Sequence, residues 1–234
     1  MNWPGQRVEA QFIGRRKRFL ADMRLQDGSV ITAHCANTGS MATCMAANAP
    51  CYLTHHPDPK RKLAYSWQAI QMPDGWVGIN TSRANALVRE AFESGTIAHF
   101  AGYQHWQAEP KVSDHSRLDA CLTGADLPAL YVEVKNVTLL GDQPGLVTFP
   151  DAVTERGTKH LAEMQRLIQL GHRAMLCFCV QRNSAAYFAP AAFIDPTYAE
   201  TLRVAHQSGV LILVLHFEIG PSGIHYRRPL PYTL

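Results

Sequence analysis

The chain has 234 residues, of which 47% are hydrophobic and 18% are charged, and this composition is typical of a folded globular protein. No apolar run approaches the ~20 residues that a membrane-crossing helix needs, which excludes an integral membrane protein of the helical kind. The first residues, MNWPGQRVEAQF, lack the apolar segment of a secretory signal, so we expect a cytoplasmic protein.

Charge is unevenly distributed along the chain. Residues 1–80 carry 9 Lys or Arg against 5 Asp or Glu, a surplus of +4, whereas residues 81–234 carry 13 against 14. A basic surplus attracts phosphate and releases counterions. We therefore expect the protein to bind DNA, single- or double-stranded, through its first 80 residues, with strong salt dependence and little sequence preference.

The region 1–80 is rich in short β-like segments separated by turn residues. The segments are 9–13, 19–25, 29–35, 51–56, 65–70 and 76–80. Many short strands with regular turns predict a small barrel. The aromatic residues of this region are Phe12, Phe19, Tyr52, Tyr65, Trp67 and Trp76. We expect most of them to fill the barrel interior, although some could stack on bases.

Two features of this barrel are candidate contacts for nucleic acid. The first is the basic run Arg15, Arg16, Lys17 and Arg18, for which the alternative is a solvated loop edge. The second is the turn Asn37-Thr38-Gly39. Asn and Gly tolerate positive φ, so the turn is first of all a backbone feature.

After residue 80 the pattern alternates between helices and strands. We expect a helix capped by Ser82 and stopped by Gly95, a second over 154–170, and a third begun by Asp195 and Pro196 and ended by Gly209. The expected strands are 104–109, 116–123, 129–138, 173–180 and 210–217. This order predicts a mixed α/β domain over 81–234, whose last strand is apolar throughout and therefore central in its sheet.

Candidate catalytic groups lie on two neighbouring strands of this domain. Because side chains alternate along a strand, Glu133 and Lys135 share a face. A hairpin of 116–123 with 129–138 would bring Asp119 close to Glu133. Two carboxylates, a backbone carbonyl and waters suit Mg²⁺ or Mn²⁺, and Lys135 would lie beside a metal-bound water. The alternative is a surface salt bridge, since a Glu-x-Lys arises by chance about 0.2 times in such a chain.

Further candidates surround these three residues. Glu90 could supply a third metal-binding carboxylate or be a helix-surface charge. Arg117 precedes Asp119 by two positions, and Arg156 and Lys159 share one side of the next helix with His160 and Glu163. Arg and Lys bind phosphate. The alternative for Arg156 and Lys159 is pairing with acids on their own helix.

The six cysteines show no CxxC pair, and Cys177 and Cys179 fall on one face of an expected buried strand. We interpret all six as free buried thiols rather than as disulfide partners or zinc ligands.

Several strings resemble the sugar fermentation stimulation protein A (SfsA) family across Arg15 to Leu234. They are HCANTGSM (34–41), SRLD (116–119), EVKNVTL (133–139), FPDAVTERGTKHL (149–161) and LPYTL (230–234). The resemblance implies an N-terminal OB-like barrel, a C-terminal domain similar to PD-(D/E)XK nucleases, and DNA binding with a proposed role in maltose metabolism. It places Asp119, Glu133 and Lys135 on the nuclease-type motif.

The chain departs from the family pattern at two places. Ala36 stands where the family often has Pro, and Pro110 interrupts a segment that usually reads Glu-Val-Lys, which counts against Glu109 as a site residue.

Two functions remain in view. The first is a sequence-nonspecific, Mg²⁺- or Mn²⁺-dependent nuclease that uses Asp119, Glu133 and Lys135. The second is a non-catalytic DNA-binding regulator of sugar metabolism with an idle nuclease-like domain. A sugar or nucleotide sensor ranks below both, because no Gly-rich phosphate loop or dinucleotide fingerprint is present.

Overall fold

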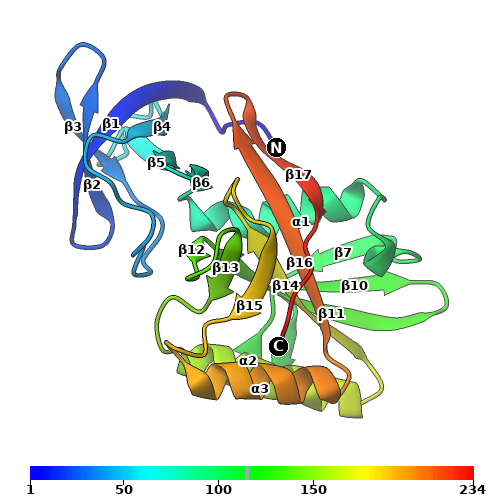
Figure 1. Ribbon diagram of the computed structural model, residues 1–234. Coiled ribbons are helices and arrows are strands. Elements are labelled where there is room, and N and C mark those ends of the chain that lie inside the picture. The colour runs from blue at the N-terminus through cyan, green and yellow to red at the C-terminus, as the bar shows by residue number, and fades with distance from the viewer. Residues whose placement is uncertain (114–115) are drawn as a thin grey trace.

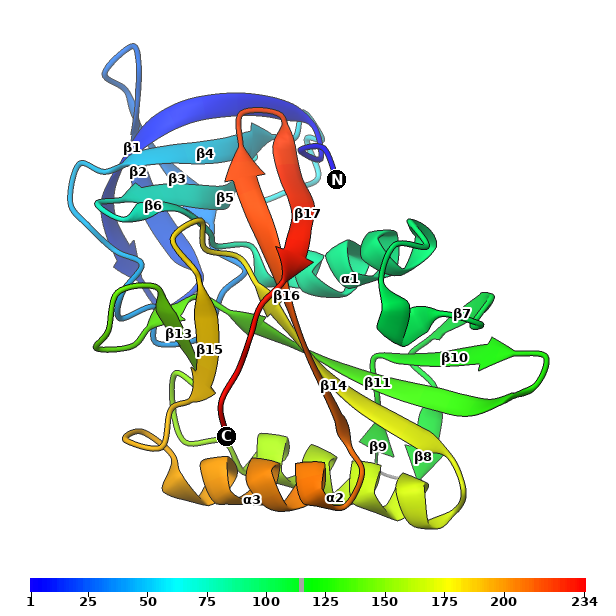
Figure 2. The same cartoon turned by 45° about the vertical axis from the view of Figure 1, so that its right-hand side comes forward.

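A computed structural model describes residues 1–113 and 116–234. Figures 1 and 2 show a β-barrel at one end of the molecule and a larger α/β unit that carries two adjacent helices at the other end. The chain thus has the expected fold class, a barrel followed by a mixed α/β domain.

The barrel contains strands β1 (Gln6–Arg16), β2 (Leu20–Leu25), β3 (Val30–His34), β4 (Pro50–His55), β5 (Tyr65–Met72) and β6 (Gly75–Gly78). They pair in the order β3-β2-β1-β4-β5-β6, and a parallel pairing of β3 with β5 closes the barrel. Inward-facing Phe12 and Trp67 stack with their ring centroids 5.0 Å apart in the core. Phe19, by contrast, is exposed.

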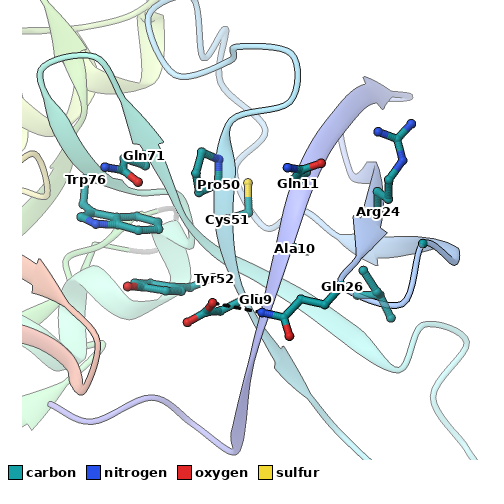
Figure 3. Close-up of a pocket in the computed structure, with 12 residues that line it drawn as sticks. Glu9, Ala10, Gln11, Arg24, Gln26, Pro50, Cys51, Tyr52, Gln71 and Trp76 are labelled. Atoms are coloured by element: carbon teal, nitrogen blue, oxygen red, sulfur yellow. Dashed lines mark hydrogen bonds between the residues drawn. The ribbon is translucent and has the colours of Figure 1, made fainter.

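Two other aromatic residues lie outside the barrel core. Tyr52 and Trp76 stack almost parallel, with ring centroids 4.0 Å apart. They form one side of a pocket of about 540 Å³ on the barrel surface, which Glu9 and Gln26 also line (Figure 3). Tyr52 also belongs to the core that the barrel shares with the α/β unit, so this pair contributes to packing between the two parts.

The α/β unit is built on a six-stranded sheet with the order β17-β16-β14-β11-β10-β7. Its strands are β7 (His105–Ala108), β10 (Ala120–Gly124), β11 (Leu127–Val137), β14 (Arg173–Val180), β16 (Leu211–Gly220) and β17 (Gly223–Pro229). Strands β11, β14 and β16 are parallel neighbours. Strands β14 and β16 are buried almost throughout, as their apolar sequences indicate. The prediction that 210–217 is central in the sheet was wrong, because β16 lies second from the edge.

Helices cover both faces of this sheet. Helix α1 (Ala84–Glu93) packs on one face against Val132, Cys177 and Leu213, and α2 (Glu155–Gln169) and α3 (Pro196–Gln207) pack on the other. Figure 2 shows α2 and α3 side by side beneath the sheet. Each face therefore has its own hydrophobic core, and β11 contributes to both.

Helix caps confirm one sequence prediction and correct another. The Asp195 side chain accepts a hydrogen bond from the Tyr198 amide (2.9 Å), with Pro196 as the first residue of α3, as predicted. Ser82 was the wrong cap for the first helix. Its hydroxyl donates to Asn80 Oδ1 (2.6 Å), and Asn80 instead caps a short 3₁₀ turn, η1 (Thr81–Arg83), that precedes α1.

Several short elements went unpredicted. They are η2 (Ala98–Phe100), the pair β8 (Lys111–Ser113) and β9 (Ser116–Arg117), and the small sheet of β12 (Leu139–Leu140), β13 (Leu146–Phe149) and β15 (Tyr187–Pro190). The predicted strand 116–123 is in fact interrupted, since β9 ends at Arg117 and β10 begins at Ala120. Such elements are too short to carry a periodic signal.

All six cysteines are free and buried, which confirms that prediction. Among the described residues, no helix combines the length and the hydropathy needed to cross a membrane.

The barrel and the α/β unit are joined by an ion pair between a buried arginine and a partly exposed aspartate. Arg182 of the α/β unit is 1% exposed, and its guanidinium donates to both carboxylate oxygens of Asp74 (2.7 and 2.6 Å) in the β5–β6 turn of the barrel. It also donates to the carbonyls of Thr43 (3.1 Å) and Thr138 (3.0 Å). Arg182 therefore bridges both parts of the molecule.

Candidate active site

Glu133 and Lys135 lie on the face of β11 that looks toward α2. Their neighbours Val132 and Val134 pack into the core on the α1 side, so the predicted alternation is present. Glu133 is only 5% exposed, and its Oε1 accepts a hydrogen bond from Lys135 Nζ at 2.6 Å. The same oxygen lies 2.5 Å from His160 Nδ1 on α2. Two potential cations therefore face one buried carboxylate.

Arg156 extends this cluster along α2. Its Nε donates to His160 Nε2 at 3.5 Å. A neutral imidazole that accepts this bond at Nε2 carries its proton on Nδ1, where it can donate to Glu133. A chain of groups thus runs from the helix surface through the imidazole to the carboxylate.

Asp119 reaches the same site from the break between β9 and β10. Its Oδ2 accepts a hydrogen bond from the Val134 backbone amide (2.7 Å), and its Oδ1 accepts one from Asn85 Nδ2 (2.8 Å) on α1. Asp119 lies just before β10 begins at Ala120, so its carboxylate accepts from the Val134 amide where a strand carbonyl would otherwise do so. The interrupted strand therefore explains how an acid is fixed beside Glu133.

The two carboxylates influence each other electrostatically. Burial raises the pKa of Asp119 above its ordinary value, and the negative charge of Glu133 raises it further. Burial also acts to raise the pKa of Glu133, but hydrogen bonds from His160 and Lys135 outweigh it, and the net pKa of Glu133 is lowered. Two like charges in a partly buried site favour a cation between them.

These residues fit a hard divalent cation. Glu133 Oε2 has no hydrogen-bond partner among the described residues, and Asp119 and Glu133 supply the one or two carboxylates that Mg²⁺ usually takes, with water completing its shell. Across residues 1–113 and 116–234, no group of three or more His, Cys, Asp or Glu is arranged to hold a metal. The described geometry thus suits a water-rich ion rather than an all-protein cage such as a structural zinc site.

The structure does not bring Glu90 into this site. Its carboxylate pairs with the terminal ammonium of Met1 (2.6 Å) and is half exposed. Glu90 follows Asn85 by five positions, which turns it about 140° around the helix from the side that meets Asp119. Glu90 is therefore a surface charge here and not a third metal-binding carboxylate. Glu109 is also exposed, and only its backbone amide contacts Asp119, at the carbonyl (3.0 Å).

The basic run divides into two structural and two free cations. Arg15 donates to the carbonyls of Arg18 (2.7 Å), Asn37 (2.7 Å) and Gly39 (3.1 Å). Arg16 makes a bidentate pair with Asp22 (2.9 and 3.1 Å). Lys17 and Arg18 are exposed at the tip of the β1–β2 turn, and their side chains have no partner among the described residues.

The other predicted phosphate contacts are exposed near the site. Arg117 lies on β9, two residues before Asp119, and Arg156 and Lys159 lie on the first turns of α2. Among the described residues Lys159 forms no ion pair with Glu155 or Glu163, and Glu163 pairs instead with Arg166 at 2.5 Å. Arg117 and Lys159 are exposed and available for a ligand, and Arg156 keeps its terminal nitrogens for one while its Nε contacts His160.

The turn Asn37-Thr38-Gly39 lies across a cleft from Lys135. This interdomain cleft has a volume of about 440 Å³ and is lined by the barrel turn, by Thr81, and by residues of β11 and β13. The sequence predicted the turn as a nucleic-acid contact and Lys135 as a catalytic residue, but it did not predict that the two line the same cleft. The role of Asn85 was also not predicted, because an Asn within a helix has no sequence pattern that marks it as a partner of Asp119.

Comparison with known proteins gives a consistent assignment over the whole chain. Residues 82–223 match the family model described as "Sugar fermentation stimulation protein RE domain", and residues 13–79 match the one described as "SfsA N-terminal OB domain". A sugar fermentation stimulation protein homolog of a Ruegeria species is 47% identical over 232 residues, 99% of this chain and 100% of the relative. A homolog of Magnetococcus marinus is 45% identical, with 100% of each chain covered.

A solved structure is also similar. It is that of Pyrococcus furiosus SfsA in complex with Ca²⁺, with a TM-score of 0.88 and 26% sequence identity, covering 100% of this chain and 98% of that one.

Proposed function

The chain belongs to the sugar fermentation stimulation protein (SfsA) family, and from this premise we propose that it is a sequence-nonspecific DNA-binding protein that cleaves phosphodiester bonds with Mg²⁺ or Mn²⁺. The observation that carries the proposal is the meeting of two carboxylates with Lys135. Asp119 and Glu133 come from different segments, and burial and mutual repulsion raise the pKa of Asp119. A divalent ion relieves that repulsion.

In this proposal Asp119 and Glu133 hold the metal, which when bound acidifies water and stabilises charge on phosphate oxygens. Asn85 and the Val134 amide orient Asp119, and His160 orients Glu133 through Oε1. Lys135 donates a hydrogen bond to Glu133 and carries a positive charge at the edge of the interdomain cleft. That charge would offset the negative charge that develops on a phosphate during cleavage.

The cations around the site give the DNA-binding part of the proposal. Arg117, Arg156 and Lys159 are exposed beside the carboxylates, and Lys17 and Arg18 are exposed on the barrel. Contacts of this type are made to phosphate and carry no sequence information. The related Pyrococcus furiosus SfsA is described in complex with Ca²⁺, a hard cation like Mg²⁺, which supports a divalent metal for this chain.

One observation favours the alternative of a DNA-binding regulator of sugar (maltose) metabolism with an idle nuclease-like domain. Glu133 is already compensated by Lys135 and His160 without any metal, so the cluster can be stable in a protein that does not cleave.

A cleavage assay distinguishes the two functions. Purified protein is incubated with end-labelled single- and double-stranded DNA in Mg²⁺, Mn²⁺ or EDTA. We expect products in either metal and none in EDTA. Binding without cleavage in every metal tested would reject the nuclease and leave the regulator.

A further inference from the structure

The interdomain cleft begins at the candidate active site and extends away from it. Lys135 forms part of its wall on β11, and the barrel turn with Asn37 and Thr38 forms another part. The cleft is preformed. Ser40 in the barrel donates from its amide to Asp151 Oδ2 (2.7 Å), and a Cβ at Gly39 would lie 2.3 Å from the same oxygen, so a larger residue there would displace the Asp151 carboxylate.

The cleft wall is rich in hydrogen-bond donors that the protein itself does not use. The Thr148 hydroxyl is the strongest case: the residue is 2% exposed, and its Oγ1 has no hydrogen-bond partner within residues 1–113 and 116–234. A buried hydroxyl without a partner is costly unless a ligand or water satisfies it. Thr148 lies on β13 and is among the residues that line the cleft; it also lines a second pocket with Leu140 and Phe193.

Two asparagine amides add to this set. The Asn37 Oδ1 accepts from the Gly39 amide (2.8 Å), and the Asn136 Oδ1 accepts from Gln181 Nε2, so both oxygens are engaged. Their NH₂ groups have no partner among the described residues and remain available as donors. Asp151 is the acidic residue of the lining, and its Oδ2 is engaged by the Ser40 amide and hydroxyl.

A wall of free donors next to a lysine suits the oxygens of a phosphate and a sugar rather than a cation or an apolar group. The volume of about 440 Å³ is that of a small-molecule site, large enough for one nucleotide and too small for a base-paired duplex. We propose that the interdomain cleft binds one unpaired nucleotide of the strand whose phosphodiester lies beside Lys135.

This proposal rests on the DNA-binding part of the proposed function and specifies its substrate. A strand that must place one nucleotide in the cleft has to be unpaired there, as it is in single strands, flaps and frayed ends. Enzymes that act on bases in a duplex pay an unpairing cost of the same kind. We therefore expect single-stranded DNA to bind more tightly than a blunt duplex of the same length and charge per strand.

The test uses Thr148→Val, which keeps the shape of the side chain and removes the unpartnered hydroxyl. The probe is deoxythymidine monophosphate, titrated in EDTA into ¹⁵N-labelled full-length protein and followed by NMR, with thymidine and inorganic phosphate as separate probes. We expect the variant to bind the nucleotide about three- to tenfold more weakly, the loss of one hydrogen bond. Its thermal midpoint should not fall, because the hydroxyl makes no bond in the free protein.

Thr123→Val is the matched control, since Thr123 is an exposed strand threonine on β10 outside the cleft. It should leave nucleotide affinity unchanged. Equal affinity in wild type and Thr148→Val, or shift changes that avoid the cleft, would overturn the proposal. The readout is binding without metal, so loss of affinity in Thr148→Val supports the nucleotide site even if the protein cleaves nothing.

Discussion

The charged groups of the β1–β2 turn and those around Glu133 are held in different ways. In the turn, Lys17 and Arg18 stand in solvent, and Arg15 and Arg16 bond to groups of the barrel itself. Around Glu133, the partners come from β11, α2, α1 and the break before β10. Exposed charges act nearly independently, whereas buried charges are coupled. A substitution in the first region should therefore change one contact, and a substitution in the second should change the whole cluster.

The largest expected effect is on cleavage. Glu133→Gln and Asp119→Asn keep the shape of each side chain but remove the charge that holds a hard cation, and each should lower metal-dependent cleavage by at least about 100-fold. Initial rates on labelled single-stranded DNA in Mn²⁺ measure this. Glu163→Gln is the control, because Glu163 lies on the same helix as His160 but pairs with Arg166 at the surface. Equal losses in all three variants would show that Glu133 and Asp119 have no specific role in metal-dependent cleavage.

The next largest effect is on stability, and it comes from a comparison of two bidentate Arg–Asp pairs. Asp74→Asn leaves Arg182, which is 1% exposed, without its counter-charge; because the Asp74 carboxylate is itself 29% exposed, the free energy of unfolding should fall by about 2 kcal/mol. Asp22→Asn breaks the same kind of pair at the surface with Arg16 and should change stability little. Urea unfolding of both variants measures the difference.

The pH dependence of unfolding tests the Asp74–Arg182 pair in a second way. Burial acts to raise the pKa of Asp74, but hydrogen bonds from Arg182 and Ser184 outweigh it and lower the net pKa. The ionised form is therefore favoured in the folded state, and its contribution is present above the ordinary carboxyl pKa of about 4 and is lost as the pH falls through the lowered value. Wild type should lose more stability than Asp74→Asn on acidification. Parallel pH profiles for the two proteins would contradict this.

The smallest effect belongs to the β1–β2 turn. Lys17→Asn with Arg18→Asn removes the two free cations, and Asn tolerates the left-handed backbone of those positions (φ 52° and 62°). If both cations contact phosphate, the slope of log affinity against log salt for duplex DNA should decrease by about 2. Arg16→Gln should leave the slope near that of wild type, because Arg16 is engaged by Asp22. A clear decrease of the slope in Arg16→Gln would show that Arg16 leaves Asp22 and contacts phosphate when DNA binds.

The sequence predicted those features that depend on local patterns. Strand alternation was enough to put Glu133 and Lys135 on one face, and the Asp195-Pro196 pair was enough to start α3. The barrel strands followed from short β-like segments between turns. These features can be predicted without knowing the tertiary contacts.

Features that depend on tertiary contacts could not be predicted. Nothing local marks the break at Asp119, because it arises where β10 leaves the Val134 amide without a strand partner. The same holds for the bond from Asn85 and for the pair of Arg182 with Asp74, whose partners are 108 positions apart. Arg15 illustrates the converse, since a basic run suggests phosphate contacts although this guanidinium is engaged by the Asn37 and Gly39 carbonyls.

The central claim is that Asp119 and Glu133 together form a divalent metal site. Calorimetric titration of Mn²⁺ into the metal-free protein tests it most directly, with Glu133→Gln and Glu163→Gln titrated alongside. We predict saturable binding of Mn²⁺ to wild type and to Glu163→Gln, and loss of that binding in Glu133→Gln. No Mn²⁺ binding to wild type, or equal binding in all three proteins, would contradict the claim.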